Sequence, residues 1–369
     1  MAGIYVHVPF CAQKCIYCDF ASYPKEIGKA EAYFALLYKE MKYRAKTLTE
    51  KTFNTIYFGG GTPSFVDAKF ILGALRLIKQ EFKLSDQLEI TLEVNPESLT
   101  KEKLEIYKKA GVNRFSVGLQ CADDIILQKL NRVHNTDQFI KAMDLLKGEN
   151  VSVDIMIGLE GQTKEHIEKS IRLAHKLGAN HISLYALKAE EGTIMFSKYL
   201  NGDLPGEDEV ADFYEFSVEI LKDLGYNRYE VSNFAKSGFE SRHNQNYWLR
   251  GEYVGFGVSA SSFIDERRFT NTSKIDEYIH LLLSGKYAEI FSENIEGDEQ
   301  KFEFIMLALR TARGIVFEEY KRKFNQDFMF QFGDKVKGLL DYLVVTKEGI
   351  KIKDEFLFVQ NNVIIQFMD

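Results

Sequence analysis

Cys11-Ala12-Gln13-Lys14-Cys15-Ile16-Tyr17-Cys18 places three cysteines within eight residues, shortly after the apolar stretch Ile4–Val8. Cysteine thiolates are the usual ligands of iron–sulfur clusters, and at this spacing each can bind a different iron of one [4Fe–4S] cube. Three ligands for four irons leave one iron open for a small molecule. We therefore predict that Cys11, Cys15 and Cys18 hold a [4Fe–4S] cluster.

Two other uses of these cysteines fit the sequence less well. A structural zinc site needs four closed ligands, usually in two separated pairs, and the one further cysteine, Cys121, is far away in sequence. A disulfide framework is typical of short secreted chains, whereas this chain has 369 residues and four cysteines.

The composition is that of a globular protein, with 45% hydrophobic and 27% charged residues. The length favours a large domain followed by a smaller one. A net charge of −7 without blocks of like charge disfavours nucleic-acid binding. No apolar run approaches the ~18 residues of a membrane span, and the N-terminus lacks the features of a signal peptide. We therefore expect a cytoplasmic protein, in a compartment that keeps thiols reduced.

Short apolar runs alternate with amphipathic stretches along the first half of the chain. The apolar runs predict six strands, at Ile4–Val8, Thr55–Phe58, Leu88–Val94, Arg114–Leu119, Val151–Ile157 and His181–Tyr185. The amphipathic stretches predict helices, at Ala30–Ala45, Ala68–Phe82, Lys101–Ala110, Phe139–Leu146 and His166–Leu177. This order predicts an α/β fold with a parallel sheet, either open or curled toward a barrel.

The residues able to do chemistry fall at the ends of these predicted strands. In parallel α/β folds ligands bind at the carboxyl ends of the strands, so we expect these residues to converge on one opening, with the cluster at its rim. No Gly-Lys-Ser/Thr follows the glycines, so a nucleotide P-loop is disfavoured. Carboxylates and an arginine beside an open iron suit a small zwitterion that carries a ribose, such as S-adenosylmethionine (SAM). The features are Gly59-Gly60-Gly61-Thr62-Pro63, Glu93, Gly118-Leu119-Gln120, Arg132 and Asp154.

The C-terminal part has a different pattern. Apolar stripes at helical spacing predict three helices, around 302–309, 317–324 and 332–343. Segments 343–346 and 350–353 predict a small hairpin. Three helices and a hairpin resemble a winged helix, but the acidic balance argues against DNA contact, so we interpret this part as a packing or partner module.

The cysteine motif, with Tyr17 before the third cysteine, resembles the signature of the radical SAM superfamily. The resemblance implies a partial (β/α)6 barrel in which the amino-acid end of SAM binds the open iron of the cluster. In that family, reduction cleaves SAM to methionine and a 5′-deoxyadenosyl radical. The cofactor carries such a reaction, while the protein supplies binding and orientation.

Within this superfamily the chain resembles the oxygen-independent coproporphyrinogen III oxidase group over nearly its whole length. The similarity implies a barrel with its extension at 1–290 and a HemN-type C-terminal helical domain at 291–369. The motifs that carry it are 5–11, 59–63, 93–96, 118–120, 131–134, 154–159, 183–187, 229–235 and 255–260. The residues that would bind SAM are Tyr5, Tyr17, Gly60, Gly61, Thr62, Glu93, Gln120, Arg132, Asp154 and Ala186.

Three features favour the haem-chaperone branch of this group, called HemW. Phe20 stands where the oxidase has a fourth cysteine, and the oxidase's N-terminal arm has no counterpart here. His243-Asn244-Gln245-Asn246-Tyr247-Trp248 resembles the HNxxYW motif of HemW. The resemblance implies that His243 contacts haem, which then passes to a recipient haemoprotein such as a membrane respiratory enzyme. The alternatives are SAM-dependent oxidative decarboxylation of coproporphyrinogen III and, with less support, a radical SAM methyltransferase.

Three residues depart from the group's pattern. Glu160 stands in place of a proline, Cys121 in place of a serine, and Ser261 in place of a histidine. The first two adjoin loops on the SAM side, and the third removes a polar contact to haem. We expect Cys121 to be a small buried residue, as free cysteines usually are.

Overall fold

Six parallel strands form the centre of the computed structural model, which describes residues 2–368. Each strand pairs with the next in chain order, as expected of consecutive βα units. All six predicted strands are present. Their bounds are β1 Ala2–Val8, β2 Thr52–Gly60, β3 Lys83–Val94, β4 Arg114–Gln120, β5 Val151–Ile157 and β6 His181–Ala186.

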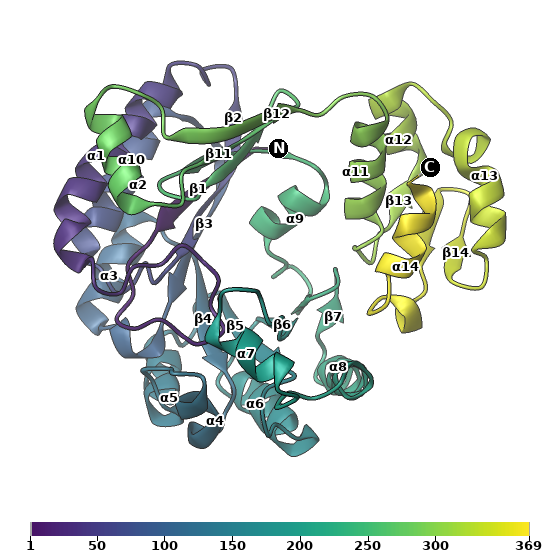
Figure 1. The fold of residues 1–369 in the computed structure, drawn as a ribbon, viewed down its shortest axis with the longest axis horizontal. Helices are drawn as coiled ribbons and strands as arrows, with labels where there is room; N and C mark the ends of the chain where they lie inside the picture. Colours follow the sequence, from purple (N-terminus) through teal and green to yellow (C-terminus); the bar gives the residue numbers. More distant parts are fainter. Residues whose placement is uncertain (1, 369) are drawn as a thin grey trace.

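Helices follow these strands and cover the outer face of the sheet (Figure 1). Their apolar sides pack on the strands in one large hydrophobic core. No helix within residues 2–368 is long and apolar enough to span a bilayer. The helices of these units are α1 Ala30–Ala45, α2 Ala68–Glu81, α3 Lys101–Ala110, α4 Asp124–Lys129, α5 Thr136–Leu145 and α6 Lys164–Lys176.

Several boundaries differ from the prediction by a few residues, and two of them have clear local reasons. Helix α5 begins at Thr136, before the predicted Phe139, because Asn135 and Gln138 form a reciprocal capping box. Strand β3 begins at Lys83, before the predicted Leu88, because its first residues pair with the start of β2. In both cases polar residues extend an element beyond its apolar stretch.

The barrel is partial, because the first and last parallel strands pair with further strands and not with each other. Strand β1 pairs with β9, and β6 pairs with β8, in a mixed twelve-stranded sheet. Helix α9 lies in the open side, against β1 and β2 (Figure 1). The added elements are α7 Ile194–Leu200, α8 Glu207–Asp223, β7 Asn227–Arg228, β8 Asn233–Ala235, α9 Arg242–Trp248, β9 Glu252–Phe256, β10 Ser261–Ile264, β11 Arg267–Asn271, α10 Ile275–Leu283 and β12 Glu289–Asn294.

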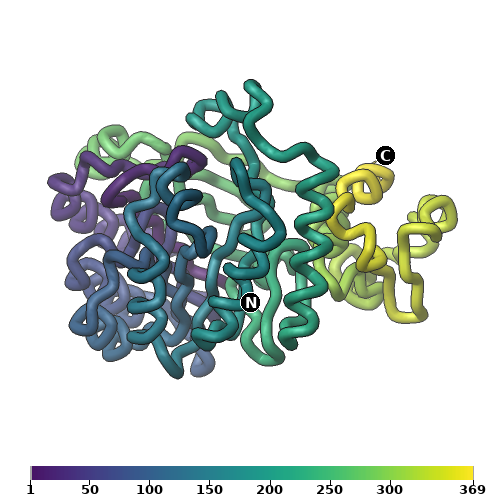
Figure 2. Tube along the Cα trace, turned by 90° about the horizontal axis from the view of Figure 1, so that it is seen from below, coloured from purple at the N-terminus to yellow at the C-terminus, as the bar shows by residue number. Residues whose placement is uncertain are grey.

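The C-terminal residues form a smaller unit beside the barrel (Figure 2). This unit has its own hydrophobic core. The predicted helices and hairpin are present, but the third helix spans Phe328–Gly338 and Leu343 belongs to the hairpin. The sheet of the first unit continues through Asn294, beyond the predicted boundary at residue 290. The elements are α11 Asp298–Ala308, β13 Ile315–Val316, α12 Phe317–Phe324, α13 Phe328–Gly338, β14 Leu343–Val345, β15 Gly349–Ile352 and α14 Asn361–Ile364.

Candidate functional site

A cavity of about 320 Å³ runs through the inside of the partial barrel. The loop that follows β1 brings Cys11, Cys15 and Cys18 to its wall. Eight of the residues predicted from the sequence line the same cavity. They are Tyr17, Gly60, Gly61, Thr62, Glu93, Gln120, Arg132 and Asp154.

The three cysteines of the loop are free thiols, buried or half-buried. Burial raises the pKa of Cys11 to about 11 and also raises the pKa of Cys18. Two polar groups lie at hydrogen-bond distance from the sulfurs, because Thr62 Oγ1 is 3.5 Å from Cys11 Sγ and Arg132 Nη1 is 3.5 Å from Cys15 Sγ. Such donors stabilise thiolates, the form in which cysteine binds metal.

This arrangement does not fit a mononuclear metal site. Within residues 2–368 no three His, Cys, Asp or Glu side chains gather around one point closely enough to hold a single ion. A [4Fe–4S] cube instead places each cysteine on a separate iron. Three free thiols on one cavity wall, with donors aimed at two of them, therefore fit a cluster better than zinc.

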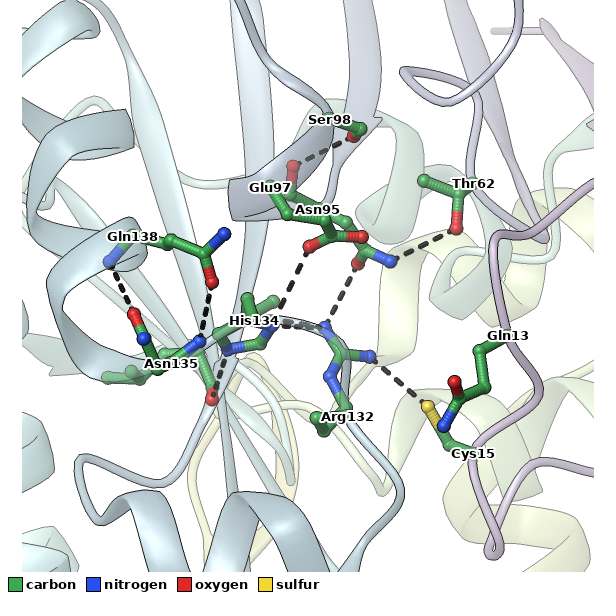
Figure 3. A network of polar contacts seen from close by, with 12 residues as sticks. Gln13, Cys15, Thr62, Asn95, Glu97, Ser98, Arg132, His134, Asn135 and Gln138 are labelled. Carbon is green, nitrogen blue, oxygen red and sulfur yellow. Dashed lines mark hydrogen bonds and ion pairs between the residues drawn. The ribbon is translucent and has the colours of Figure 1, made fainter.

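Arg132 is the centre of the polar network at the cysteine end of the cavity (Figure 3). Its Nη2 donates to Asn95 Oδ1 at 3.0 Å and to the Gly118 carbonyl oxygen at 3.3 Å. Asn131, in the left-handed region with φ 59°, turns the chain just before it. The Nε atom of Arg132 has no partner among the described residues, and the Arg132 guanidinium forms no ion pair with a described carboxylate. Its charge is therefore available to a ligand carboxylate.

His134 supports Arg132 as a neutral side chain. Burial, together with the adjacent guanidinium, lowers the pKa of His134 to about 3. A neutral imidazole leaves Nδ1 as an acceptor, 3.3 Å from Arg132 Nη2, while Nε2 donates to the Leu119 carbonyl oxygen at 3.3 Å. These contacts fix the direction of the arginine.

Two carboxyl groups face the cavity from neighbouring parts of the barrel. Glu93 accepts from the Tyr57 hydroxyl at 2.9 Å and from the Gly60 N–H at 3.2 Å, and enclosure raises its pKa to about 7. Asp154 accepts from Ser116 Oγ at 3.2 Å, and enclosure raises its pKa to about 6. Both groups can accept hydrogen bonds from ammonium or hydroxyl groups of a ligand.

Gly60 is required by the backbone at this position. Its φ is +110°, a conformation that side chains disfavour, and a Cβ there would collide with the imidazole ring of His7. The glycine therefore lets the backbone N–H approach Glu93 and the cavity.

Two predicted SAM-site residues do not line the cavity. Tyr5 lies behind the wall, where its hydroxyl is 3.0 Å from His7 Nδ1 and its ring stacks on Tyr57 with centroids 6.2 Å apart. Ala186 is exposed at the end of β6. Tyr5 thus contacts the cavity wall through the ring of Tyr57.

His243, predicted to contact haem, is also outside the cavity. The residue is only 2% exposed, with Nδ1 2.8 Å from Thr55 Oγ1 and Nε2 2.9 Å from the Tyr247 hydroxyl. Burial lowers the pKa of His243 to about 3, so the ring is neutral. Because the ring is buried and both nitrogens have partners, a haem iron can reach one of them only after a rearrangement around α9.

The sequence reasoning missed Tyr57, Arg114 and His181, which also line the cavity. The alternation of side chains along the strands could have identified them, because every second residue of a strand points to the same face of the sheet. In β4 the residues on the face of Gln120 are Arg114, Ser116 and Gly118, and an arginine inside an apolar strand is unusual.

The three departures from the group pattern lie outside the cavity wall. Glu160 pairs with Lys129 at 3.1 Å and with Lys198 at 2.6 Å, joining α4 to α7. Cys121 is fully buried in a small apolar cluster, as expected. Ser261 bonds to Thr270 within the sheet, at 2.9 Å.

Comparison with known proteins gives a consistent result. Residues 5–174 match the model of the radical SAM superfamily. The chain is 34% identical to the heme chaperone HemW of Bacillus subtilis strain 168, over 92% of each chain. It is 32% identical to the heme chaperone HemW of Lactococcus lactis subsp. lactis strain IL1403, over 99% of this chain and 96% of that one.

A solved structure shares the fold. Coproporphyrinogen III oxidase (HemN) from Escherichia coli, a radical SAM enzyme, superposes with a TM-score of 0.87 over 99% of this chain and 89% of that one. The sequence identity is 20%, so this likeness concerns the architecture alone.

Proposed function

Because this chain belongs to the HemW family within the radical SAM superfamily, we propose that it binds haem and passes it to a recipient haemoprotein. The observation that carries the proposal is the similarity to named haem chaperones along almost the entire chain, C-terminal unit included. The recipient would be another haemoprotein, such as a respiratory enzyme of the membrane, and the reduced thiols suit the cytoplasm.

The cavity would hold the cofactors that the superfamily implies. Cys11, Cys15 and Cys18 are the proposed ligands of a [4Fe–4S] cluster, which would supply an open iron and one-electron chemistry. Arg132, with no carboxylate partner among the described residues, would bind the carboxylate of SAM. Glu93 would accept a hydrogen bond from the amino group or the ribose of SAM, and Asp154 would accept hydrogen bonds from other polar groups of SAM.

Haem binding by His243 needs a second conformation. The ring nitrogens now bond to Thr55 and Tyr247, and one of these two contacts must break before the iron can take its place. Helix α9 is a short element of seven residues in the open side of the barrel, so its displacement would leave the six parallel strands intact. We propose that haem is held in this way.

A haemin titration of the anaerobically reconstituted protein, followed by its Soret band, tests the proposal. We expect saturable, stoichiometric binding that is weaker, with a shifted Soret band, in His243→Ala. His280→Ala, which removes an exposed histidine on α10, is the matched control and should bind as the wild type does. Non-saturating binding would reject the haem-chaperone function. Normal binding by His243→Ala would reject only the assignment of His243 as the ligand of the haem iron.

The decarboxylase alternative is tested in the same preparation. Phe20, at the position of the oxidase's additional cysteine, is 59% exposed and lines the cavity. We expect no protoporphyrinogen after anaerobic incubation with SAM, reductant and coproporphyrinogen III. Accumulation of that product would instead favour the enzyme.

A further inference from the structure

The end of the cavity away from the cysteines contains a second buried arginine. Arg114 is the first residue of β4, is 2% exposed and lines the cavity. Gln120 ends the same strand at the cysteine end, about 20 Å away at roughly 3.3 Å per residue. The proposed SAM contacts lie near the cysteines, so Arg114 belongs to a separate part of the cavity.

The hydrogen bonds of Arg114 go to neutral groups. Its Nη1 donates to Asn150 Oδ1 at 3.2 Å and to the Phe239 carbonyl oxygen at 2.9 Å, and both acceptors are neutral. No carboxylate of residues 2–368 forms an ion pair with it. Burial of a cation without a paired anion raises the free energy of the folded state. An anion that enters the cavity and binds this guanidinium would therefore be stabilised.

The other deeply buried arginines behave differently. Arg44 pairs with Glu289 at 2.9 Å. Arg250 pairs with Glu303 and with Glu266, both at 2.6 Å. These two arginines lie outside the wall of this cavity and pair with carboxylates, whereas Arg114 lies on the wall and forms no ion pair within residues 2–368.

Hydroxyl groups on β5 and β6 line the same cavity as Arg114. Ser152 Oγ lies 2.7 Å from His181 Nδ1 and 3.3 Å from Ser183 Oγ, and all three residues line the cavity. His181 Nε2 is held by the Tyr229 hydroxyl at 2.8 Å. The acid on this wall, Asp154, accepts from Ser116 and forms no ion pair with the guanidinium, although the charge of Arg114 and the hydroxyl of Ser183 both act on its carboxyl group. One cation beside one acid suits a singly charged ligand group better than a dianionic phosphate.

We propose that Arg114, with Ser152 and Ser183, forms a carboxylate-binding subsite that receives a propionate group of haem. This inference rests on the proposed function, because haem is the ligand that brings the carboxylate. The planar guanidinium can bind a carboxylate through two parallel hydrogen bonds, which would orient the porphyrin as well as attract it. The carboxylate of SAM is the other source of the same chemistry, and the experiment separates the two.

The test compares haemin with haemin dimethyl ester, in which both propionates are neutral. Both are titrated into the full-length reconstituted protein and into Arg114→Gln, with Arg44→Gln as the control for loss of a buried arginine elsewhere. We expect Arg114→Gln to weaken haemin binding about tenfold or more and ester binding less than twofold, with SAM affinity unchanged. Arg44→Gln should change none of the three.

Each other result rejects the subsite. Equal loss for haemin and ester, or no loss for either, would show that the propionate does not meet Arg114, while saturable wild-type binding still upholds the haem-chaperone function. Loss of SAM affinity alone would assign Arg114 to SAM. If Arg114→Gln fails to fold, haemin is titrated into Ser152→Ala and Ser183→Ala instead. Unchanged haemin binding in both serine variants would overturn the proposal. Failure of the wild type to bind haemin saturably rejects the function itself.

Discussion

The hydroxyl of Tyr57 donates a 2.9 Å hydrogen bond to Oε1 of Glu93, whose carboxyl faces the cavity. The ring of Tyr57 also stacks on His243, with centroids 5.0 Å apart. One tyrosine therefore contacts both the proposed SAM site and the histidine of the HNxxYW-like segment. The two places are thus joined by packed rings and a hydrogen bond.

Replacing Glu93 by Gln should change how stability depends on pH. The folded protein holds a proton on Glu93 up to a pKa of about 7, whereas the ordinary value is 4.5. Between these values the folded state binds more protons than the unfolded state, so the contribution of Glu93 to stability falls as pH rises from about 4.5 to 7. Glu93→Gln should therefore be more stable than the wild type at pH 8, by up to about 3 kcal/mol, and nearly equal to it at pH 4.5.

Urea unfolding of the protein without added cofactors, at both pH values, measures this difference. Glu105→Gln, at an exposed position on α3, is the control and should leave the profile unchanged. If the free energy of unfolding of Glu93→Gln changes with pH in parallel with that of the wild type, burial does not disfavour the ionised form of Glu93.

Replacing Cys11, Cys15 and Cys18 together by Ser should abolish the cluster, because hydroxyl groups do not replace thiolates as iron ligands. After anaerobic reconstitution we expect bound iron and sulfide near zero and no broad visible absorption. Cys121→Ser, in a buried apolar cluster that does not itself bring Cys121 to the cavity wall, should retain both signals. Full iron content in the triple variant would reject the ligand assignment.

Arg132→Lys should lower SAM affinity about tenfold or more, because lysine keeps the charge but cannot reproduce the planar contacts to Asn95 and a ligand carboxylate. Equilibrium dialysis with labelled SAM measures this, and iron content is checked because Arg132 also reaches Cys15. Arg172→Lys, in an exposed ion pair, is the control. Wild-type affinity in Arg132→Lys would remove this arginine from the SAM site.

The side chain of Arg250 is only 1% exposed and lies between Glu266 and Glu303. Arg250→Met should destabilise the protein by about 3 kcal/mol, because it removes the cation that pairs with both carboxylates. Glu303 lies on α11, so the same change weakens the contact between the barrel and the C-terminal unit. Arg313→Met, which breaks an exposed pair with Glu319, should cost less than about 1 kcal/mol. Equal losses in urea unfolding would contradict this ranking.

Much of the candidate site was predictable from the sequence, because consecutive βα units bring the carboxyl ends of their strands to one edge. That rule places the cysteine loop, Gly60, Glu93, Gln120 and Arg132 on one cavity without any knowledge of distances. Tyr57 and Arg114 were missed because a residue inside a strand points into or out of a barrel according to register and twist.

The sequence by itself determined the spacing of the three cysteines, the series of strand–helix units and the small helical unit after them, because these depend on neighbours along the chain. Only the tertiary structure decided that His243 is buried and that Arg114 has no carboxylate partner. The Thr55 that holds His243 is 188 residues away, and the Phe239 carbonyl that holds Arg114 is 125 residues away. The partners of a buried polar group are set by long-range packing, which brings together groups that no local pattern relates.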